Sequence, residues 1–337
     1  MKYALVDTAN TFFRARHIAS KRSDTWEKIG MALHLTLAST NQIVRKFGID
    51  HVVFGLEGRS WRKSFYKAYK AHRVLDETAM TQAEIDENKM FWETYETFTK
   101  FLIEKTNCSV IRHPEAEADD VIARFIHLHP NDHHYIISSD TDYIQLINDN
   151  VSQYNGVARE LITPDGYFDD KGKLIVNKKT KEQKTLGDPK FILFEKCMRG
   201  DGTDNVFSAY PGVRTKGSKN KVGLIEAYAD RDKQGFAWNN IMLQRWVDHE
   251  DVEHRVRDDY ERNRTLIDLT AQPEDIKDKV DGAIRDMVRR NTTPSVGIHF
   301  MKFCSKYELT RISDQAETYA KWLNSPYEGN VHENINT

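Results

Sequence analysis

The chain has 337 residues, of which 39% are hydrophobic and 30% are charged, and its formal net charge is −2. This length allows one large domain or two ordinary domains, each with its own core. The sequence lacks both an apolar run of the roughly 20 residues that span a bilayer and a secretory signal pattern, which predicts a cytoplasmic protein without membrane contact.

Strands and helices alternate in the N-terminal half of the sequence. Four β-branched, apolar stretches are typical of short buried strands: 2–7, 51–58, 108–113 and 133–140. A helix is expected directly after the first strand, and further helical segments lie at about 27–47, 87–105 and 118–128. This alternation predicts an α/β fold in which a mostly parallel central sheet carries helices on both faces. In such sheets, ligands bind beyond the carboxyl ends of the strands.

The sequence changes character after residue 160. Gly, Asp and Lys are frequent between about 160 and 186, which predicts a hairpin with solvated turns. A mostly helical stretch follows from 188 to 325, interrupted by a loop at 210–223. We therefore expect a first domain at 1–186, a mainly helical domain at 187–326 and a disordered tail at 327–337.

Cysteines and charges are unevenly distributed along the chain. Cys108, Cys197 and Cys304 are far apart and lack CxxC spacing, so we expect buried thiols rather than disulfides or a zinc site. Acids gather in short clusters and bases in separate runs. The small net charge therefore does not exclude a nucleic-acid partner.

Carboxylates are crowded at the start of the helix expected at 118–128. The stretch VIRHPEAEADDVIARF, residues 110–125, carries Glu115, Glu117, Asp119 and Asp120. Acids in a first helical turn complement the helix dipole and cap backbone N–H groups, which explains this stretch taken alone. However, IISSDTDYIQL (136–146) and MRGDGTDNV (198–206) each place two more aspartates at the end of an apolar run.

The expected topology brings most of these acids to one rim of the sheet. Asp7, Glu57 and Asp140 each close a strand at the same edge. Carboxylates so close together repel each other and need a counter-charge to stay ionised. Oxygen ligands suit Mg²⁺ or Mn²⁺, and two such ions about 4 Å apart can drive phosphodiester hydrolysis. The candidate metal ligands are Asp7, Glu57, Glu117, Asp119, Asp120, Asp140, Asp142, Asp201 and Asp204.

A second signal is the basic segment GRSWRKSFYKAYKAHR, residues 58–73. It contains bases but no acid, and its aromatic residues are Trp61, Phe65, Tyr66 and Tyr69. Lysine and arginine side chains can bind phosphates, while aromatic rings can stack on unpaired nucleobases. The alternative is an amphipathic helix with its aromatic residues in the core and its bases in solvent. The candidate nucleic-acid contacts here are Arg59, Arg62, Lys63 and Lys67.

A third signal is the glycine-containing loop at 210–223, which precedes a helix. Its bases are Arg214, Lys216, Lys219 and Lys221. Such a loop can bind a duplex backbone through side chains and backbone amides, although a merely solvated loop explains the local pattern nearly as well. Its position just after Asp201 and Asp204 favours binding.

Four acidic motifs occur in the order and spacing of a known superfamily: VDTAN at 6–10, EADD at 117–120, SSDTDYIQL at 138–146 and GDGTDN at 200–205. Together they resemble the flap endonuclease or 5′-nuclease superfamily, and the resemblance extends to about residue 325. The later stretch NRTLIDL, residues 263–269, is most similar to the T-even phage ribonuclease H.

This resemblance implies a PIN-like 5′-nuclease core followed by a helical duplex-DNA-binding domain with a helix-turn-helix-like element. It implies a two-metal 5′-3′ exonuclease and flap endonuclease with ribonuclease H activity that removes RNA primers in phage DNA replication. The implied cofactor is Mg²⁺, as two ions, with Mn²⁺ as a substitute. The implied substrates are DNA and RNA–DNA duplexes with 5′ ends or flaps. A monomer is expected, with a single-stranded-DNA-binding protein or a sliding clamp among its partners.

The resemblance also assigns roles to residues. Around a first ion it places Asp7, Glu57, Glu117, Asp119, Asp120 and Asp140, and nearer a second ion Asp142, Asp201 and Asp204. Lys70 and Arg73 match a catalytic basic pair at the base of a helical arch, which is expected around 58–95. If this segment is helical, the two side chains lie one turn apart on one face.

The sequence departs from the family pattern in two places. Glu57 stands where the family usually has Asp, which allows a water-mediated ligand. Arg214 follows Gly212-Val213 in a turn that is usually Gly-hydrophobic-Gly, so the potassium site of that turn is in question. Two alternative functions are a catalytically inactive DNA-binding protein and a related acid-cluster endoribonuclease. The complete acid set argues against the first, and the length and basic loop argue against the second.

Overall fold

The computed structural model describes residues 1–18, 24–73, 78–288 and 292–331. The chain forms two compact units. Unit 1 comprises 1–60, 80–186 and 274–337, and unit 2 comprises 61–79 and 187–273. Among the residues that the structure describes, we find no helix with the length and hydropathy needed to cross a membrane.

Unit 1 is built on a seven-stranded sheet of order β3-β2-β1-β4-β5-β6-β7. The strands are β1 (Lys2–Asp7), β2 (His51–Gly55), β3 (Ser109–Ile111), β4 (His133–Ile137), β5 (Val151–Asn155), β6 (Glu160–Thr163) and β7 (Gly166–Asp169). The pairs from β3 to β5 are parallel, and β6 and β7 add an antiparallel edge. The mostly parallel sheet predicted from the sequence is therefore confirmed.

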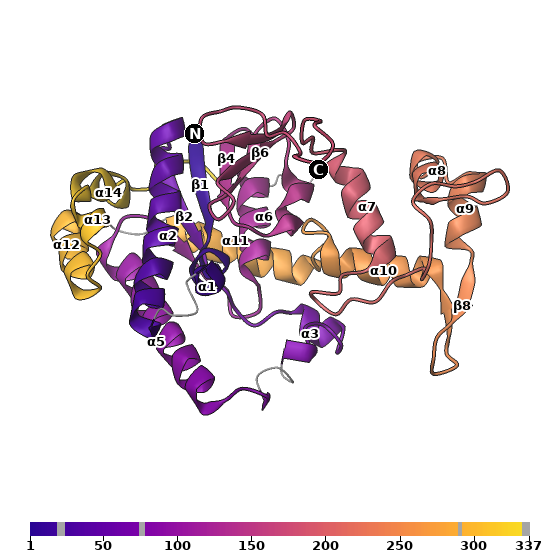
Figure 1. Ribbon diagram of the computed structural model, residues 1–337, viewed down its shortest axis with the longest axis horizontal. Helices are drawn as coiled ribbons and strands as arrows, with labels where there is room; N and C mark the ends of the chain where they lie inside the picture. The colour runs from indigo at the N-terminus through magenta and orange to yellow at the C-terminus, as the bar shows by residue number, and fades with distance from the viewer. Residues whose placement is uncertain (19–23, 74–77, 289–291, 332–337) are drawn as a thin grey trace. The chain divides into compact units, whose positions relative to one another are not determined.

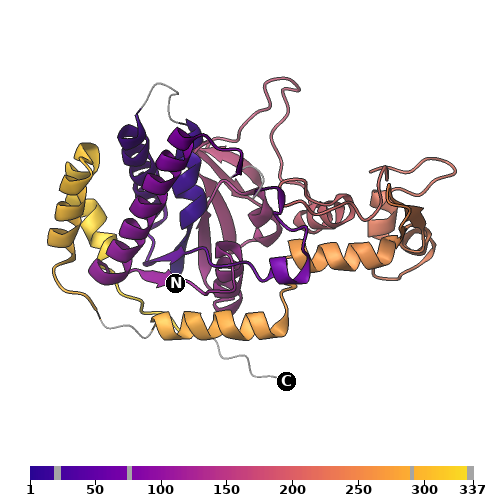
Figure 2. The same ribbon diagram turned by 90° about the horizontal axis from the view of Figure 1, so that it is seen from below.

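Helices cover both faces of this sheet, as predicted (Figure 1, Figure 2). One face carries α1 (Thr8–Ile18), α2 (Thr25–Phe47), α5 (Gln82–Lys105) and α14 (Ala316–Leu323). The other face carries α6 (Ala118–Leu128) and α11 (Glu274–Val288). The remaining elements of unit 1 are η1 (Thr141–Leu146), α12 (Val296–Lys306) and α13 (Thr310–Ser313).

Local sequence explains why these elements start and stop where they do. Residues 3–6 of β1 are all fully buried, which suits a central strand with helices on both sides. Helix α2 begins after Asp24, whose carboxylate accepts the Glu27 backbone N–H at 2.8 Å. It ends at Gly48, where φ is +62°, a left-handed conformation that favours glycine.

Unit 2 is mainly helical. Its elements are α3 (Arg62–Phe65), α7 (Pro189–Arg199), α8 (Leu224–Ala229), α9 (Phe236–Met242), β8 (Arg245–Val247), β9 (Glu253–Arg255) and α10 (Val256–Ile267). Phe194, Met198 and Trp238 belong to its core. The antiparallel β8–β9 pair was not predicted, because three-residue strands are too short to show a period of two.

The chain returns to unit 1 after residue 273. The expected helical domain at 187–326 therefore extends beyond unit 2, and its last part belongs to unit 1. Phe300 and Phe303 of α12 pack against Phe101 of α5, with ring centroids 6.4 and 4.4 Å apart. Tyr327 stacks against Tyr3 of β1 at 6.2 Å. Residues 332–337 of the expected tail lie outside the described residues.

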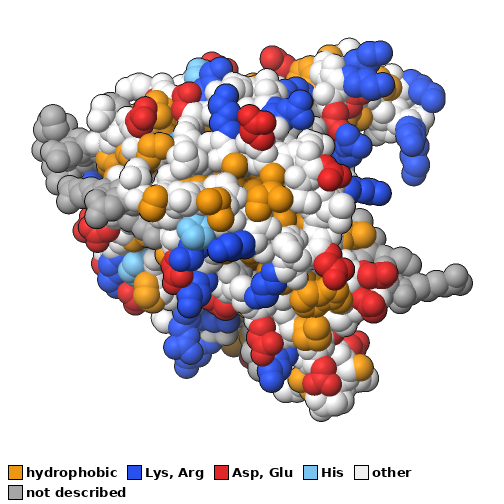
Figure 3. Space-filling model, turned by 90° about the vertical axis from the view of Figure 1, so that its left-hand side faces the viewer, with side chains coloured by type: hydrophobic (Ala, Val, Ile, Leu, Met, Phe, Trp, Pro, Cys, Tyr) orange, Lys and Arg blue, Asp and Glu red, His pale blue; other side chains and the backbone are white. Residues whose placement is uncertain are grey.

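The face of unit 1 that carries α12 to α14 mixes exposed apolar side chains with lysines and arginines (Figure 3). Ile298 and Met301 of α12 are 61% and 45% exposed. The three cysteines are buried, as the sequence predicted.

A buried ion pair fastens α11 to α6. The Arg124 guanidinium donates to both carboxylate oxygens of Asp281, at 2.7 and 2.6 Å, and neither side chain is more than 8% exposed. Helix α6 also carries Glu117, Asp119 and Asp120 at its start, so this pair contributes to the placement of these acids.

We expect Asp281→Ala to lower the free energy of unfolding by about 3–5 kcal/mol, because it leaves the Arg124 guanidinium buried without its counter-charge. Urea unfolding followed by circular dichroism measures the change. The control is Glu96→Ala, which breaks the exposed Arg112–Glu96 pair and should cost less than about 1 kcal/mol. Equal losses would contradict a stabilising role for the buried pair.

Candidate metal centre

The carboxyl ends of β1, β2 and β4 bring acids of unit 1 together. Asp7 ends β1, Glu57 follows β2 by two residues, and Asp140 follows β4 by three. The buried phenol of Tyr143 lies among them. Burial first, and then the charges of Asp7, Asp119, Asp140 and Glu57, raise its pKa well above the ordinary value. These four acids therefore all lie close enough to the Tyr143 phenol to act on its pKa, and Asp7 accepts its hydroxyl at 3.1 Å.

Asp7 is the most deeply placed of these four acids, with 5% of its surface exposed. Its carboxylate accepts the Asn10 backbone N–H at 3.1 Å and the hydroxyls of Ser138 and Tyr143 at 3.0 and 3.1 Å. Burial, with a further contribution from the charge of Asp140, raises the pKa of Asp7 to about 6. All three donors are neutral, so ionised Asp7 would be stabilised by a nearby cation.

The start of α6 holds a second group of acids. Glu117 caps the helix and accepts the Ser60 hydroxyl at 2.8 Å, while Glu57 accepts the Ala118 backbone N–H at 3.3 Å. Asp120 is fully buried and accepts the Glu117 backbone N–H at 3.1 Å. Asp120 thus has the capping role that the sequence left open.

Asp140 and Asp142 lie on the turn after β4. Asp140 is exposed and accepts the Asp142 backbone N–H at 3.0 Å, which starts η1, and Asp142 is half-buried. All the acid ligands of the rim offer oxygen atoms, which suits a hard divalent cation better than a soft one. The residues present therefore fit such an ion.

Unit 2 places Asp201 and Asp204 in a turn beside three cations. Lys196 contacts the Asp201 carboxylate at 2.8 Å. Burial pushes the pKa of Asp201 upward, but the hydrogen bond and charge of Lys196 outweigh this effect and lower that pKa overall. Asp204 contacts Arg73 at 3.0 Å and Lys70 at 3.6 Å.

The expectation that Lys70 and Arg73 share one helical face is wrong. Helix α3 ends at Phe65, and Lys70 lies in a turn with φ of +53°. The two cations nevertheless meet at the Asp204 carboxylate. Residues 74–77 of the expected arch lie outside the described residues.

The basic segment 58–73 divides between core and surface. Arg62 is 1% exposed and its Nε donates to the Leu266 carbonyl at 2.8 Å, so the expectation that it contacts nucleic acid is wrong. Trp61 and Tyr69 are also buried, as the amphipathic alternative required. Phe65 stays 51% exposed. The candidate nucleic-acid contacts that are exposed are Arg59, Lys63 and Lys67.

The loop before α8 displays its four bases to solvent. Arg214, Lys216, Lys219 and Lys221 are all exposed. The Glu226 carboxylate accepts the backbone N–H groups of Gly217 and Gly223, at 3.0 and 2.9 Å. These two amides are therefore engaged within the loop, and its side chains are the groups that can reach a phosphate backbone.

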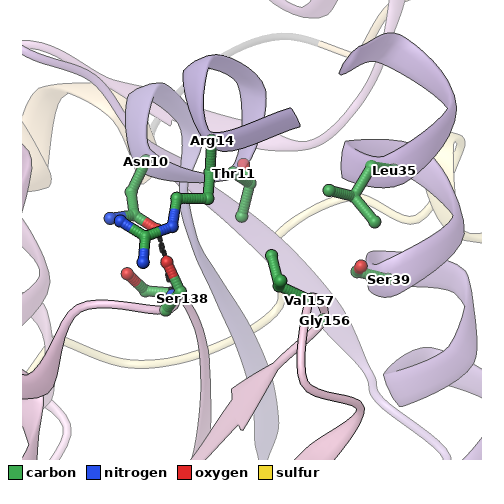
Figure 4. A pocket seen from close by; sticks show the side chains of 9 residues that line it. Asn10, Thr11, Arg14, Leu35, Ser39, Ser138, Gly156 and Val157 are labelled. Atoms are coloured by element: carbon green, nitrogen blue, oxygen red, sulfur yellow. Dashed lines mark hydrogen bonds between the residues drawn. The ribbon is translucent and has the colours of Figure 1, made fainter. Parts of the chain in front are cut away.

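A hollow beside the rim acids contains an arginine that the sequence reasoning missed. In Figure 4, Arg14 of α1 extends over Asn10 and Ser138. Asn10 accepts the backbone N–H and hydroxyl of Ser139, at 2.9 and 2.8 Å. Arg14 follows Asn10 by four residues on α1, a spacing that puts both side chains on one helix face and could have revealed it.

A family comparison agrees with this arrangement. The family described as "5'-3' exonuclease, N-terminal resolvase-like domain" matches residues 2–178, just over half of the chain. The chain belongs to this 5′-3′ exonuclease family. The match contains β1 to β7 and every rim acid of unit 1 discussed above.

Two relatives cover the same part of the chain. DNA polymerase I of Rhizobium leguminosarum is 28% identical over 184 residues, which are 54% of this chain and 15% of that protein. A 5′-3′ exonuclease of Buchnera aphidicola subsp. Schizaphis graminum (strain Sg) is 25% identical over 182 residues, which are 53% of each protein. The chain thus spans about half or less of the length of these relatives.

A solved structure shares the fold over a longer stretch. It is a complex of the bacteriophage T5 D15 flap endonuclease with DNA and metal ions. The two chains are 18% identical with a TM-score of 0.54, and the similarity covers 86% of this chain and all of the other. The PIN-like 5′-nuclease fold expected from the acidic motifs is therefore present.

Asp7 gives the metal-free protein a distinctive pH dependence. The native state binds the Asp7 proton more tightly than the unfolded chain, because its pKa is raised from 3.8 to about 6. The parent therefore loses stability as the pH rises from about 4 to about 6. We expect Asp7→Asn to be more stable than the parent in chelator by about 1–3 kcal/mol at about pH 7.5, and the gain to vanish near pH 4.

Urea unfolding at the two pH values in chelator measures this difference. The control is Asp165→Asn at an exposed aspartate, which should change stability by less than about 0.5 kcal/mol at either pH. A variant with Asp7→Asn that is less stable than the parent at both pH values would show that ionised Asp7 is well accommodated without a cation.

Proposed function

We propose that this protein is a metal-dependent 5′-3′ exonuclease and flap endonuclease with ribonuclease H activity. It hydrolyses phosphodiesters near the 5′ ends of RNA–DNA and DNA–DNA duplexes and removes primers in phage DNA replication. The observation that carries this proposal is the set of acids around Tyr143 at the strand ends, in a chain of the 5′-3′ exonuclease family. The stretch NRTLIDL, residues 263–269, resembles the T-even phage ribonuclease H and supports the ribonuclease H activity and the phage setting.

The residues that would hold a divalent ion in unit 1 are Asp7, Glu57, Glu117, Asp119 and Asp140. Asp120 contributes indirectly, because it caps α6 and so fixes Glu117. A bound Mg²⁺, or Mn²⁺ in its place, lowers the pKa of water and stabilises the oxygens of a phosphodiester. The assignment of Asp142, Asp201 and Asp204 to a second ion follows the resemblance.

The chain's own cations have separate tasks in this proposal. Lys70 and Arg73 face the phosphate that is cleaved, and Lys216 and Lys219 of the exposed loop hold the duplex backbone. The T5 flap endonuclease complex contains DNA, which supports a nucleic-acid substrate for this fold. Replication proteins such as a single-stranded-DNA-binding protein or a sliding clamp would be partners by the same resemblance.

A single assay separates this function from its two alternatives. A 5′-flap duplex and an RNA–DNA hybrid, each labelled at either end, are incubated with Mg²⁺ or with chelator. We expect Mg²⁺-dependent products from the 5′ end of both substrates.

We expect Asp140→Asn to abolish cleavage while duplex binding without metal stays within a few-fold of the parent, because the amide cannot hold the ion. If the parent binds the duplex but cleaves neither substrate, the inactive DNA-binding protein is favoured. If it cleaves only RNA, and at internal positions, the endoribonuclease is favoured.

Arg14 is proposed to contact a substrate phosphate beside the rim acids, because it is exposed at a hollow next to Ser138, whose hydroxyl donates to Asp7. We expect Arg14→Ala to weaken binding of the flap duplex and to reduce the slope of log affinity against log salt by about 0.9, the value for one phosphate contact. The matched control is Arg45→Ala, at an exposed arginine near the opposite edge of the sheet. Identical slopes for the two variants would exclude this contact.

A further inference from the structure

The turn Tyr66–Arg73 of unit 2 is held by the Asp201–Val206 turn. The Lys70 backbone N–H donates to the Asp204 carbonyl at 2.8 Å. The Asn205 side chain donates to the Ala68 carbonyl, also at 2.8 Å. Neighbouring residues of one turn thus fix the backbone of the other at two points.

The Asp204 carboxylate adds a second layer of contacts to the same turn. Its Oδ1 accepts from Arg73 at 3.0 Å, and its Oδ2 accepts the Tyr69 hydroxyl at 2.9 Å. The Lys70 ammonium lies 3.6 Å from Oδ2 and 4.8 Å from the centre of the Tyr69 ring. The Asp204 side chain is 19% exposed and Tyr69 is 3% exposed, so their contact is shielded from solvent, whereas the Arg73 side chain is 50% exposed.

The backbone of Lys70 needs such support. Its φ of +53° lies in the left-handed region, which residues with a Cβ adopt only when the surroundings hold them there. The hydrogen bond from its N–H to Asp204 and the ion pair of its side chain both end on one residue. Asp204 therefore contacts Lys70 both at its backbone N–H and at its ammonium.

We propose that Asp204 is a positioning residue for Lys70 and Arg73, in addition to any part it has in binding metal. The proposal rests on the proposed function, in which these two cations act on the cleaved phosphate. Asp201 has a different place, because its carboxylate pairs with Lys196. The structure thus gives separate tasks to two aspartates that the motif GDGTDN presents as equivalent.

Hydrogen exchange in the presence of chelator tests the proposal without any cleavage. We expect Asp204→Asn to speed exchange of the amides between residues 66 and 73 about tenfold, the effect of losing a charge-assisted hydrogen bond. Tyr69→Phe keeps every charge and should speed the same amides by a smaller factor. The control is Asp232→Asn, at an exposed aspartate of unit 2, which should leave them at the parent rate. If Asp204 serves metal alone, none of these variants changes the exchange without metal, and that result would overturn the proposal.

A double-mutant cycle on cleavage supplies the second readout. Asp204→Asn is combined with the pair Lys70→Ala and Arg73→Ala, and single-turnover rates are measured on one 5′-flap substrate. If Asp204 acts through the two cations, its substitution costs much less in the background that lacks them. Fully multiplicative losses would overturn the positioning role. If the unsubstituted protein cleaves no substrate, the proposed function is refuted. The hydrogen-exchange result would still show whether Asp204 positions the turn that carries Lys70 and Arg73.

Discussion

Repulsion between carboxylates at the ends of the parallel strands is a cost that this fold must offset. Parallel pairing of β1 with β2 and β4 brings Asp7, Glu57 and Asp140 to one edge. Burial and the charges of these acids raise the pKa of Tyr143, and burial raises the pKa of Asp7 to about 6. A fold that gathers acids in this way loses stability unless a cation joins them, because buried ionised groups need a counter-charge.

The two units answer this constraint differently. In unit 2 the counter-charges come from the chain itself, since Lys196 pairs with Asp201 while Lys70 and Arg73 pair with Asp204. In unit 1 the contacts of Asp7 are with the neutral donors Asn10, Ser138 and Tyr143. These donors hold the carboxylate in place but do not neutralise it. The chemistry of unit 1 is therefore open to an external divalent cation, whereas the acids of unit 2 also organise the cations of the protein.

The parts of the fold that depend on local patterns could be predicted from the sequence. Runs of β-branched residues predicted β1 to β4, and their parallel order predicted the acid rim. Features that depend on distant partners could not be predicted. Arg62 is buried because the Leu266 carbonyl accepts from it, and Lys70 adopts its turn because Asp204 holds it. A basic residue in a charged run is expected to be exposed. Leu266 and Asp204 are far from Arg62 and Lys70 in the sequence, so no local pattern predicts these contacts.

We propose that the rim acids of unit 1 form a divalent-cation site. Titration with Mn²⁺, followed by the paramagnetic resonance of the free ion, measures binding directly and needs no substrate. We expect saturable binding by the parent and its loss when Asp7→Asn and Asp140→Asn are combined, whereas neutralising the exposed Asp232 and Asp251 leaves binding unchanged. Equal Mn²⁺ binding by the parent and the rim variant would show that these acids do not form the site.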